Sequence, residues 1–196
     1  MQPLSHEELW SLTDYARQRP TFRQRVIAHK QPRRVAIGSH AMLYFEDRLT
    51  IQYQIQEMLR AEEIAEPATI EEELSTYNPL IPQHNSLSAT FMLEYADPKV
   101  RQARLAQLVG IEYLVWAQIT PFDRVFAIAD EDLLRSTEDK TSAVHFLRFT
   151  FNDDMVKQFL REPRLALGID HPNYHHRVDD LSAATLSSLA ADFEEQ

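Results

Sequence analysis

Two predicted strands that follow each other closely constrain the fold most. Residues 112–119 and 124–129 are both rich in β-branched and aromatic side chains, which favours strand. Only residues 120–123 separate them, whereas a crossover between parallel strands needs about a dozen residues or more. The sheet must therefore be at least partly antiparallel. Further strands are predicted over residues 35–37, 42–45, 88–95, 143–151 and 165–169.

Helical patterns fill the remaining segments and both ends of the chain. Ser5 and Glu8 form an S-x-x-E capping box, which predicts a first helix. Pro20 is expected to break or restart that helix, because a proline lacks the backbone N–H that a helix interior needs. A second helix should then run to about Lys30, with Pro32 ending the stretch. Further helices are predicted over residues 54–63, 69–78, 98–109, 153–161 and 181–193.

Together these elements predict the fold class. We expect one α+β domain over residues 1–196, with a mostly antiparallel sheet and helices packed on one face. Residues 1–32 would form an N-terminal helical segment, and residues 33–196 would supply the sheet and its covering helices.

Composition excludes several function classes. The chain has no cysteine, which removes disulfides, zinc–thiolate sites and a cysteine nucleophile. Its three glycines, Gly38, Gly110 and Gly168, fit neither of the two common glycine-rich phosphate loops. No signal peptide and no membrane-spanning stretch is recognisable, so a cytoplasmic protein without membrane contact is expected.

Charge is unevenly distributed along the chain. The formal net charge of −10 disfavours nucleic-acid binding, which requires a basic footprint. Residues 17–34 nevertheless contain no acid, and this window could either dock on the acidic remainder of the chain or bind an anionic ligand or acidic partner. The partner-facing candidates in this window are Arg19, Arg23, Arg33 and Arg34.

The predicted strand 143–151 carries two polar candidates. His145 and Arg148 are three residues apart, so they should point to opposite faces of the sheet. A histidine among apolar neighbours is commonly a hydrogen-bonded core residue, although it can also exchange protons in catalysis. If Arg148 is buried it needs a carboxylate partner, and Glu94 is the candidate.

Metal sites receive little support. His171 and His175 are four residues apart, but Pro172 and Asn173 between them indicate a turn in which His171 binds backbone groups. In the acid-rich segment 57–73 no glutamate has a histidine three residues later, as a diiron carboxylate site would require. We therefore predict no metal and no cofactor.

The segment 77–82 (YNPLIP) is a stiff loop, because two prolines restrict it. Its apolar residues Leu80 and Ile81 need burial, either in the core or under a partner or ligand.

Several short segments together resemble one bacterial family. They are 33–38 (RRVAIG), 45–48 (FEDR), 54–58 (QIQEM), 76–82 (TYNPLIP), 87–90 (LSAT), 109–112 (VGIE), 142–149 (SAVHFLRF) and 170–174 (DHPNY). In this order they resemble the DUF3501 family, whose function is unknown. The resemblance implies a redox or oxidative-stress setting, with a rubrerythrin-like protein or an iron–sulfur oxidoreductase as partner. It implies no catalytic residues.

Two hypotheses for the function follow. The first is a non-enzymatic accessory protein that binds a redox partner, which the segregated charge favours. The second is an enzyme or small-ligand module, with a metal as a further variant; homo-oligomer formation is open in both. The polar site of the second hypothesis would be formed by Glu57, Glu94, His145, Arg148, His171 and Tyr174.

Overall fold

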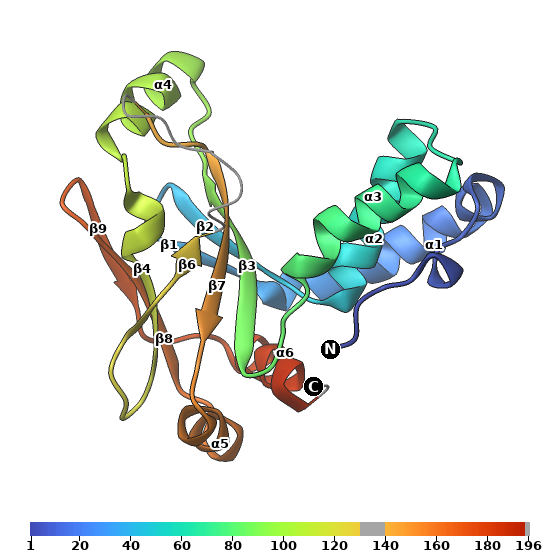
Figure 1. Ribbon diagram of the computed structural model, residues 1–196. Helices are drawn as coiled ribbons and strands as arrows, with labels where there is room; N and C mark the ends of the chain where they lie inside the picture. Colours follow the sequence, from blue (N-terminus) through green and yellow to red (C-terminus); the bar gives the residue numbers. More distant parts are fainter. Residues whose placement is uncertain (130–139, 195–196) are drawn as a thin grey trace.

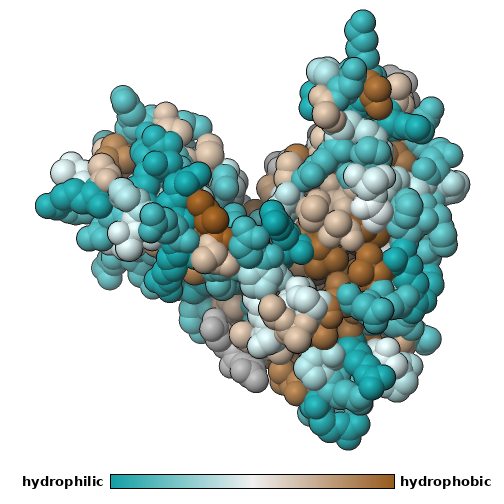
Figure 2. Space-filling view, turned by 180° about the vertical axis from the view of Figure 1, so that it is seen from behind, coloured by the Kyte–Doolittle hydropathy of each residue, from teal (hydrophilic) through white to brown (hydrophobic). Residues whose placement is uncertain are grey.

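The computed structural model of the protein describes residues 1–129 and 140–194. A unit of three helices lies beside two antiparallel sheets (Figure 1). From the reverse side a wide notch separates the helical unit from the sheets (Figure 2). No helix within the described ranges is long and apolar enough to span a bilayer.

The helical unit consists of η1 (His6–Glu8), α1 (Leu12–Lys30), α2 (Arg48–Ala61) and α3 (Pro67–Tyr77). Apolar residues from α2 and α3 form a small core of their own, and α1 adds an aromatic cluster against α2. After α3 the chain makes a further turn, η3 (Asn78–Leu80), before it enters the first sheet. The members of the two clusters that are fully covered include Tyr15, Phe22, Val26, Ile51, Ile55, Leu59, Ile70, Leu74 and Ile81.

The N-terminal helix differs from the prediction. The capping box of Ser5 and Glu8 is present, but it starts only the short turn η1, and Ser11 caps α1 instead. Pro20 does not break α1, which continues through it to Lys30. Tyr15 lies before Pro20 and Phe22 lies after it, and both pack in the same aromatic cluster. This packing on both sides of the proline offsets the hydrogen bond that it removes.

The strands divide between two sheets. The first has the order β1 (Arg34–Ile37), β2 (Ala41–Glu46), β3 (Ser86–Leu93), β7 (Val144–Thr150) and β6 (Ile128–Ala129). The second has the order β5 (Val125–Phe126), β4 (Val115–Ile119), β8 (Leu165–His171) and β9 (Tyr174–Val178). Every strand pairing among the described residues is antiparallel, which confirms the predicted α+β class.

One apolar core joins the two sheets. Side chains at alternate strand positions point inward from both sheets, as strand geometry requires. Three helices, α4 (Pro98–Gln107), α5 (Asp153–Arg161) and α6 (Ala183–Glu194), each add side chains to this core. The fully covered members include Leu43, Phe91, Phe149, Val115, Leu167, Ile169, Phe159 and Leu189.

One strand prediction needs correction, and one strand was missed. Residues 124–129 were expected to form one strand, but the segment divides at Ala127, so that β5 joins the second sheet and β6 joins the first. The turn expected at Pro172 and Asn173 is present and joins β8 to β9, with His171 opposite Tyr174, whereas the strand β9 itself was not predicted. The division of 124–129 is decided by pairing, because β5 pairs with β4 whereas β6 pairs with β7.

The outer face of the second sheet is organised around Trp116. This residue is only 1% exposed, because Gly168 on the adjacent strand leaves room for its ring and Arg124 stacks 4.0 Å from the ring centre. The indole N–H donates to Asp170 at 2.9 Å, and Arg124 binds the second oxygen of the same carboxylate at 2.6 Å.

We predict that Gly168→Ala destabilises the fold. An added Cβ would lie 2.1 Å from Cζ2 of Trp116, so the indole or the strand must move. Chemical denaturation should show a loss of about 1–3 kcal/mol or more. In a Trp116→Val background the same change should cost much less, because the clash is then absent. An equal cost in both backgrounds would contradict this account.

Candidate functional site

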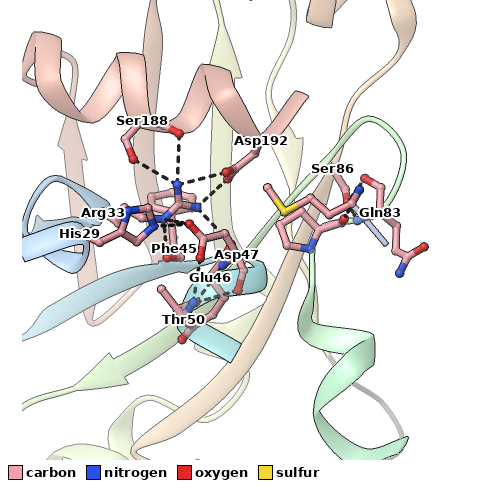
Figure 3. Close-up of polar contacts among 12 residues, drawn as sticks. His29, Arg33, Phe45, Glu46, Asp47, Thr50, Gln83, Ser86, Ser188 and Asp192 are labelled. Atoms are coloured by element: carbon pink, nitrogen blue, oxygen red, sulfur yellow. Dashed lines mark hydrogen bonds and ion pairs between the residues drawn. The ribbon is translucent and has the colours of Figure 1, made fainter. Parts of the chain in front are cut away.

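A buried arginine joins the distant parts of the chain. Arg33 is 2% exposed and donates to both carboxylate oxygens of Asp192, at 3.1 and 2.6 Å (Figure 3). It also donates to the hydroxyl and the carbonyl oxygen of Ser188, and to the carbonyl oxygens of Phe45 and Glu46, all at 3.1 Å. Burial alone would lower the pKa of Arg33, but the charge of Asp192 holds that pKa above its ordinary value. Arg33 is thus an internal structural residue, which corrects its prediction as a partner-facing one.

Asp47 extends this network to the helical unit. Its carboxylate caps α2 by accepting from the N–H of Thr50 at 2.9 Å, and it lies 3.3 Å from Nε of Arg33. Nε2 of His29, at the end of α1, is hydrogen-bonded to the same carboxylate (Figure 3). Burial would raise the pKa of Asp47, but His29 and Arg33 lower it below its ordinary value. The ends of α1 and α6 and the start of α2 are therefore held at one point.

Other cations of the basic window remain at the surface. Arg19 binds Glu57 with two hydrogen bonds of 2.7 and 2.9 Å, so this partner-facing candidate is half-buried and already paired. In contrast, some exposed cations on α1 and β1 make no ion pair with any residue that the structure describes. We define the basic face as these exposed cations together with the half-buried Lys30: Arg23, Arg25, Lys30 and Arg34. The ammonium of Lys30 lies 5.8 Å from the ring centre of Tyr53.

Glu57 belongs to this helical unit and not to a shared polar site. Its carboxylate also accepts from the hydroxyl of Tyr15 at 2.6 Å. The hydrogen bonds from Arg19 lower the pKa of Glu57 to about 2, in spite of partial burial. The ion pair between Arg19 on α1 and Glu57 on α2 keeps this glutamate charged and fixes the position of its side chain.

Arg148 and Glu94 do not pair. As predicted, His145 and Arg148 point to opposite faces of the sheet; His145 is buried and Arg148 is exposed, so Arg148 needs no carboxylate partner. It lies opposite Ser88, whereas Glu94 follows the end of β3 and accepts from the hydroxyl of Tyr44 at 2.9 Å. The register of β3 and β7 therefore separates the two residues, and the expected ion pair is wrong.

His145 lies in a buried polar cluster that the sequence did not indicate. Its Nε2 is 2.9 Å from Oγ1 of Thr141 and 3.0 Å from the carbonyl oxygen of Ser142. Thr141 also donates to Glu112 at 3.2 Å, and Glu112 is only 3% exposed. No motif connects Glu112 with His145, because Glu112 lies in the short helix η4 (Ile111–Leu114) before β4, His145 lies in β7, and the two meet only in the fold.

His171 and Tyr174 hold backbone groups. Nδ1 of His171 accepts from the N–H of Asn173 at 3.1 Å, which confirms the predicted role of His171 in a turn. The hydroxyl of Tyr174 donates to the carbonyl oxygen of Ile37 at 2.7 Å. It also accepts from the N–H groups of His40 and Ala41 at 2.9 and 3.0 Å. Both side chains therefore stabilise hairpins through hydrogen bonds with backbone groups.

The six polar candidates thus do not form one site. Glu57 lies in the helical unit, Arg148 on the outer face of the first sheet and His145 in the core. Glu94 and Tyr174 approach the same β1–β2 turn, and His171 lies in the β8–β9 hairpin. Among the described residues no group of three or more His, Asp or Glu could hold a metal ion.

The comparisons with known proteins agree with this fold. A model of DUF3501, described as a protein of unknown function, matches residues 3–193. The chain belongs to the DUF3501 family. This confirms the resemblance and brings no activity with it.

The chain is also similar to a solved structure. The crystal structure of a novel protein of unknown function from Burkholderia pseudomallei K96243, at 1.90 Å resolution, is 44% identical to this chain, with a TM-score of 0.92. The match covers 97% of this chain and 99% of that chain. A search of curated proteins finds no match. Neither comparison assigns an activity to this DUF3501 protein.

We predict that Asp192→Ala strongly destabilises the protein. The change leaves the Arg33 guanidinium buried beside fewer carboxylates, and breaking a buried pair in this way typically costs about 3–5 kcal/mol. Asp179→Ala is the matched control, because the Arg177–Asp179 pair is exposed and should contribute about 1 kcal/mol or less. Equal losses of unfolding free energy would contradict the structural role of Arg33.

The stability that Glu57 contributes should depend on pH. Because its folded pKa of about 2 lies below its ordinary value of 4.5, this contribution is complete above pH 4.5. It is lost as the pH falls towards 2. The difference in unfolding free energy between wild type and Glu57→Gln should therefore shrink over that range. Glu66→Gln, which removes an exposed glutamate, should show a small difference at every pH.

Proposed function

We propose that this protein is a cytoplasmic, non-enzymatic accessory protein that binds an acidic surface of a redox partner through the basic face. The observation that carries the proposal is the set of cations on this face. Arg23, Arg25 and Arg34 are exposed, Lys30 is half-buried, and none of the four makes an ion pair with the described residues. They stand out on a chain whose net charge is −10.

The shape of the basic face favours a protein partner. Its cations follow the exposed side of a long helix and the strand after it, so they present a broad surface instead of converging on one point. Ile27, which is 42% exposed, lies among them and offers an apolar contact. Complementary charges of this kind accelerate association and select partners more than they add affinity.

Two further observations support a binding role. The other arginines of the same window are paired within the chain: Arg33 is buried with Asp192, Arg19 binds Glu57 and the exposed Arg17 pairs with Asp14, so the fold separates paired cations from those on the basic face. The six polar residues of the enzyme alternative do not meet at one point and so do not support a shared catalytic centre. The family resemblance supplies the partner class, a rubrerythrin-like protein or an iron–sulfur oxidoreductase.

The proposal is tested by reversing charge on the basic face. Arg23→Glu/Arg25→Glu should weaken binding to the purified rubrerythrin-like protein or iron–sulfur oxidoreductase of the same organism by about tenfold or more. Wild-type affinity should also fall as salt rises from about 50 to about 300 mM, because exposed charges are screened. Calorimetry or biolayer interferometry measures both effects.

The matched control is Lys99→Glu/Arg101→Glu on α4. These two residues are exposed, have the same spacing and give the same change in net charge. The control should bind like the wild type. If neither partner class binds, or if both double variants lose affinity equally, the basic face is not the docking surface.

A further inference from the structure

A pocket lies where the helical unit meets the outer face of the first sheet. Its volume is about 390 Å³, within the range of small-molecule sites. The sheet supplies the floor, and η3, which follows α3, supplies one wall through Pro79 and Leu80. The floor includes Glu46, Ser88, Ile128, Phe146 and Arg148.

Strand register places the charged residues in one row. Glu46 on β2 lies opposite Ser88 on β3, Ser88 lies opposite Arg148 on β7, and Arg148 lies opposite Ile128 on β6. Directly paired residues point to the same face of a sheet. Adjacent strands are about 4.8 Å apart, so the backbones of Glu46 and Arg148 are separated by roughly 10 Å. The small side chain of Ser88 between them leaves the space open.

The wall of the pocket is held in place. The side chain of Asn78 accepts from the N–H of Leu4 at 2.8 Å and donates to its carbonyl oxygen at 2.9 Å. Ile81, directly after η3, is completely buried in the core of the helical unit. Leu80 is therefore presented to the pocket by a fixed turn, which limits the entropy lost when a ligand binds.

The two charged groups of the pocket have different surroundings. The Glu46 carboxylate is half-buried and accepts from the hydroxyl of Thr90 at 2.7 Å, which orients it. Arg148 is exposed and makes no ion pair within the described ranges, with Glu46 or with any other residue. The pocket thus offers a cation, a fixed anion and apolar surface from Phe146, Ile128 and Leu80.

We propose that this pocket binds a free apolar amino acid. The ligand carboxylate binds the Arg148 guanidinium through two parallel hydrogen bonds, and the ammonium group faces Glu46. The apolar side chain of the ligand packs on Phe146, Ile128 and Leu80. Glu46 also discriminates against ligands with a second anionic group, because it would repel them. The inference is independent of the proposed function, since the pocket residues lie outside the basic face.

Titration calorimetry with leucine and phenylalanine tests the proposal, using the wild-type chain. Isocaproic acid is leucine without its amino group, and isoamylamine is leucine without its carboxyl group. We expect an amino acid to bind, and each analogue to bind about tenfold more weakly or worse, because isocaproic acid loses the contact of the ammonium group with Glu46 and isoamylamine loses the hydrogen bonds to Arg148. If neither amino acid binds, or if isocaproic acid binds as tightly as leucine, the proposal is overturned.

Variants locate the site. Arg148→Gln should lower the affinity for the bound amino acid and for isocaproic acid by about tenfold or more, and Glu46→Gln should abolish the preference for the amino acid over the acid. Arg101→Gln, which removes an exposed arginine on α4, is the control and should bind normally. Thermal melts of the three variants establish that each is folded. Unchanged binding in folded Arg148→Gln would overturn the proposal.

Discussion

The buried ion pair of Arg33 with Asp192 is the contact on which the arrangement of the chain depends. The guanidinium is almost fully removed from water, which is costly unless its donors are satisfied. Asp192, Ser188 and the carbonyl groups at the end of β2 supply the acceptors. Since Asp47 joins the same group and caps α2, the helical unit, the first sheet and the C-terminal helix are fixed to one another there.

This arrangement has a consequence for the charged surface. The basic window contributes some cations to the interior and leaves others outside, although all of them look alike in the sequence. Arg33 and Arg19 meet carboxylates contributed by α6 and α2, whereas Arg23, Arg25 and Arg34 remain exposed. In the fold, one run of basic residues therefore supplies both a buried ion pair and the exposed basic face.

Strand register determines the pocket in a similar way. Alternation along 143–151 correctly predicted that His145 and Arg148 point to opposite faces of the sheet. It could not show which residue of another strand lies beside Arg148, because a shift by one position changes every neighbour. The register selects Ser88 and, one strand further, Glu46, and it places Glu94 beyond the end of β3. The pocket is therefore formed by the pairing of strands, and its residues share no local sequence motif.

The sequence by itself determined the α+β class, the antiparallel pairing, most element positions and the family, because these follow from local patterns and from short connections. It did not determine the continuity of α1 through Pro20, the division of 124–129 between two sheets, or the partners of Arg33, Arg148 and His145. Only the tertiary structure decided these features, because each depends on contacts between residues far apart in the chain, such as Arg33 and Asp192, whose energies no local pattern encodes.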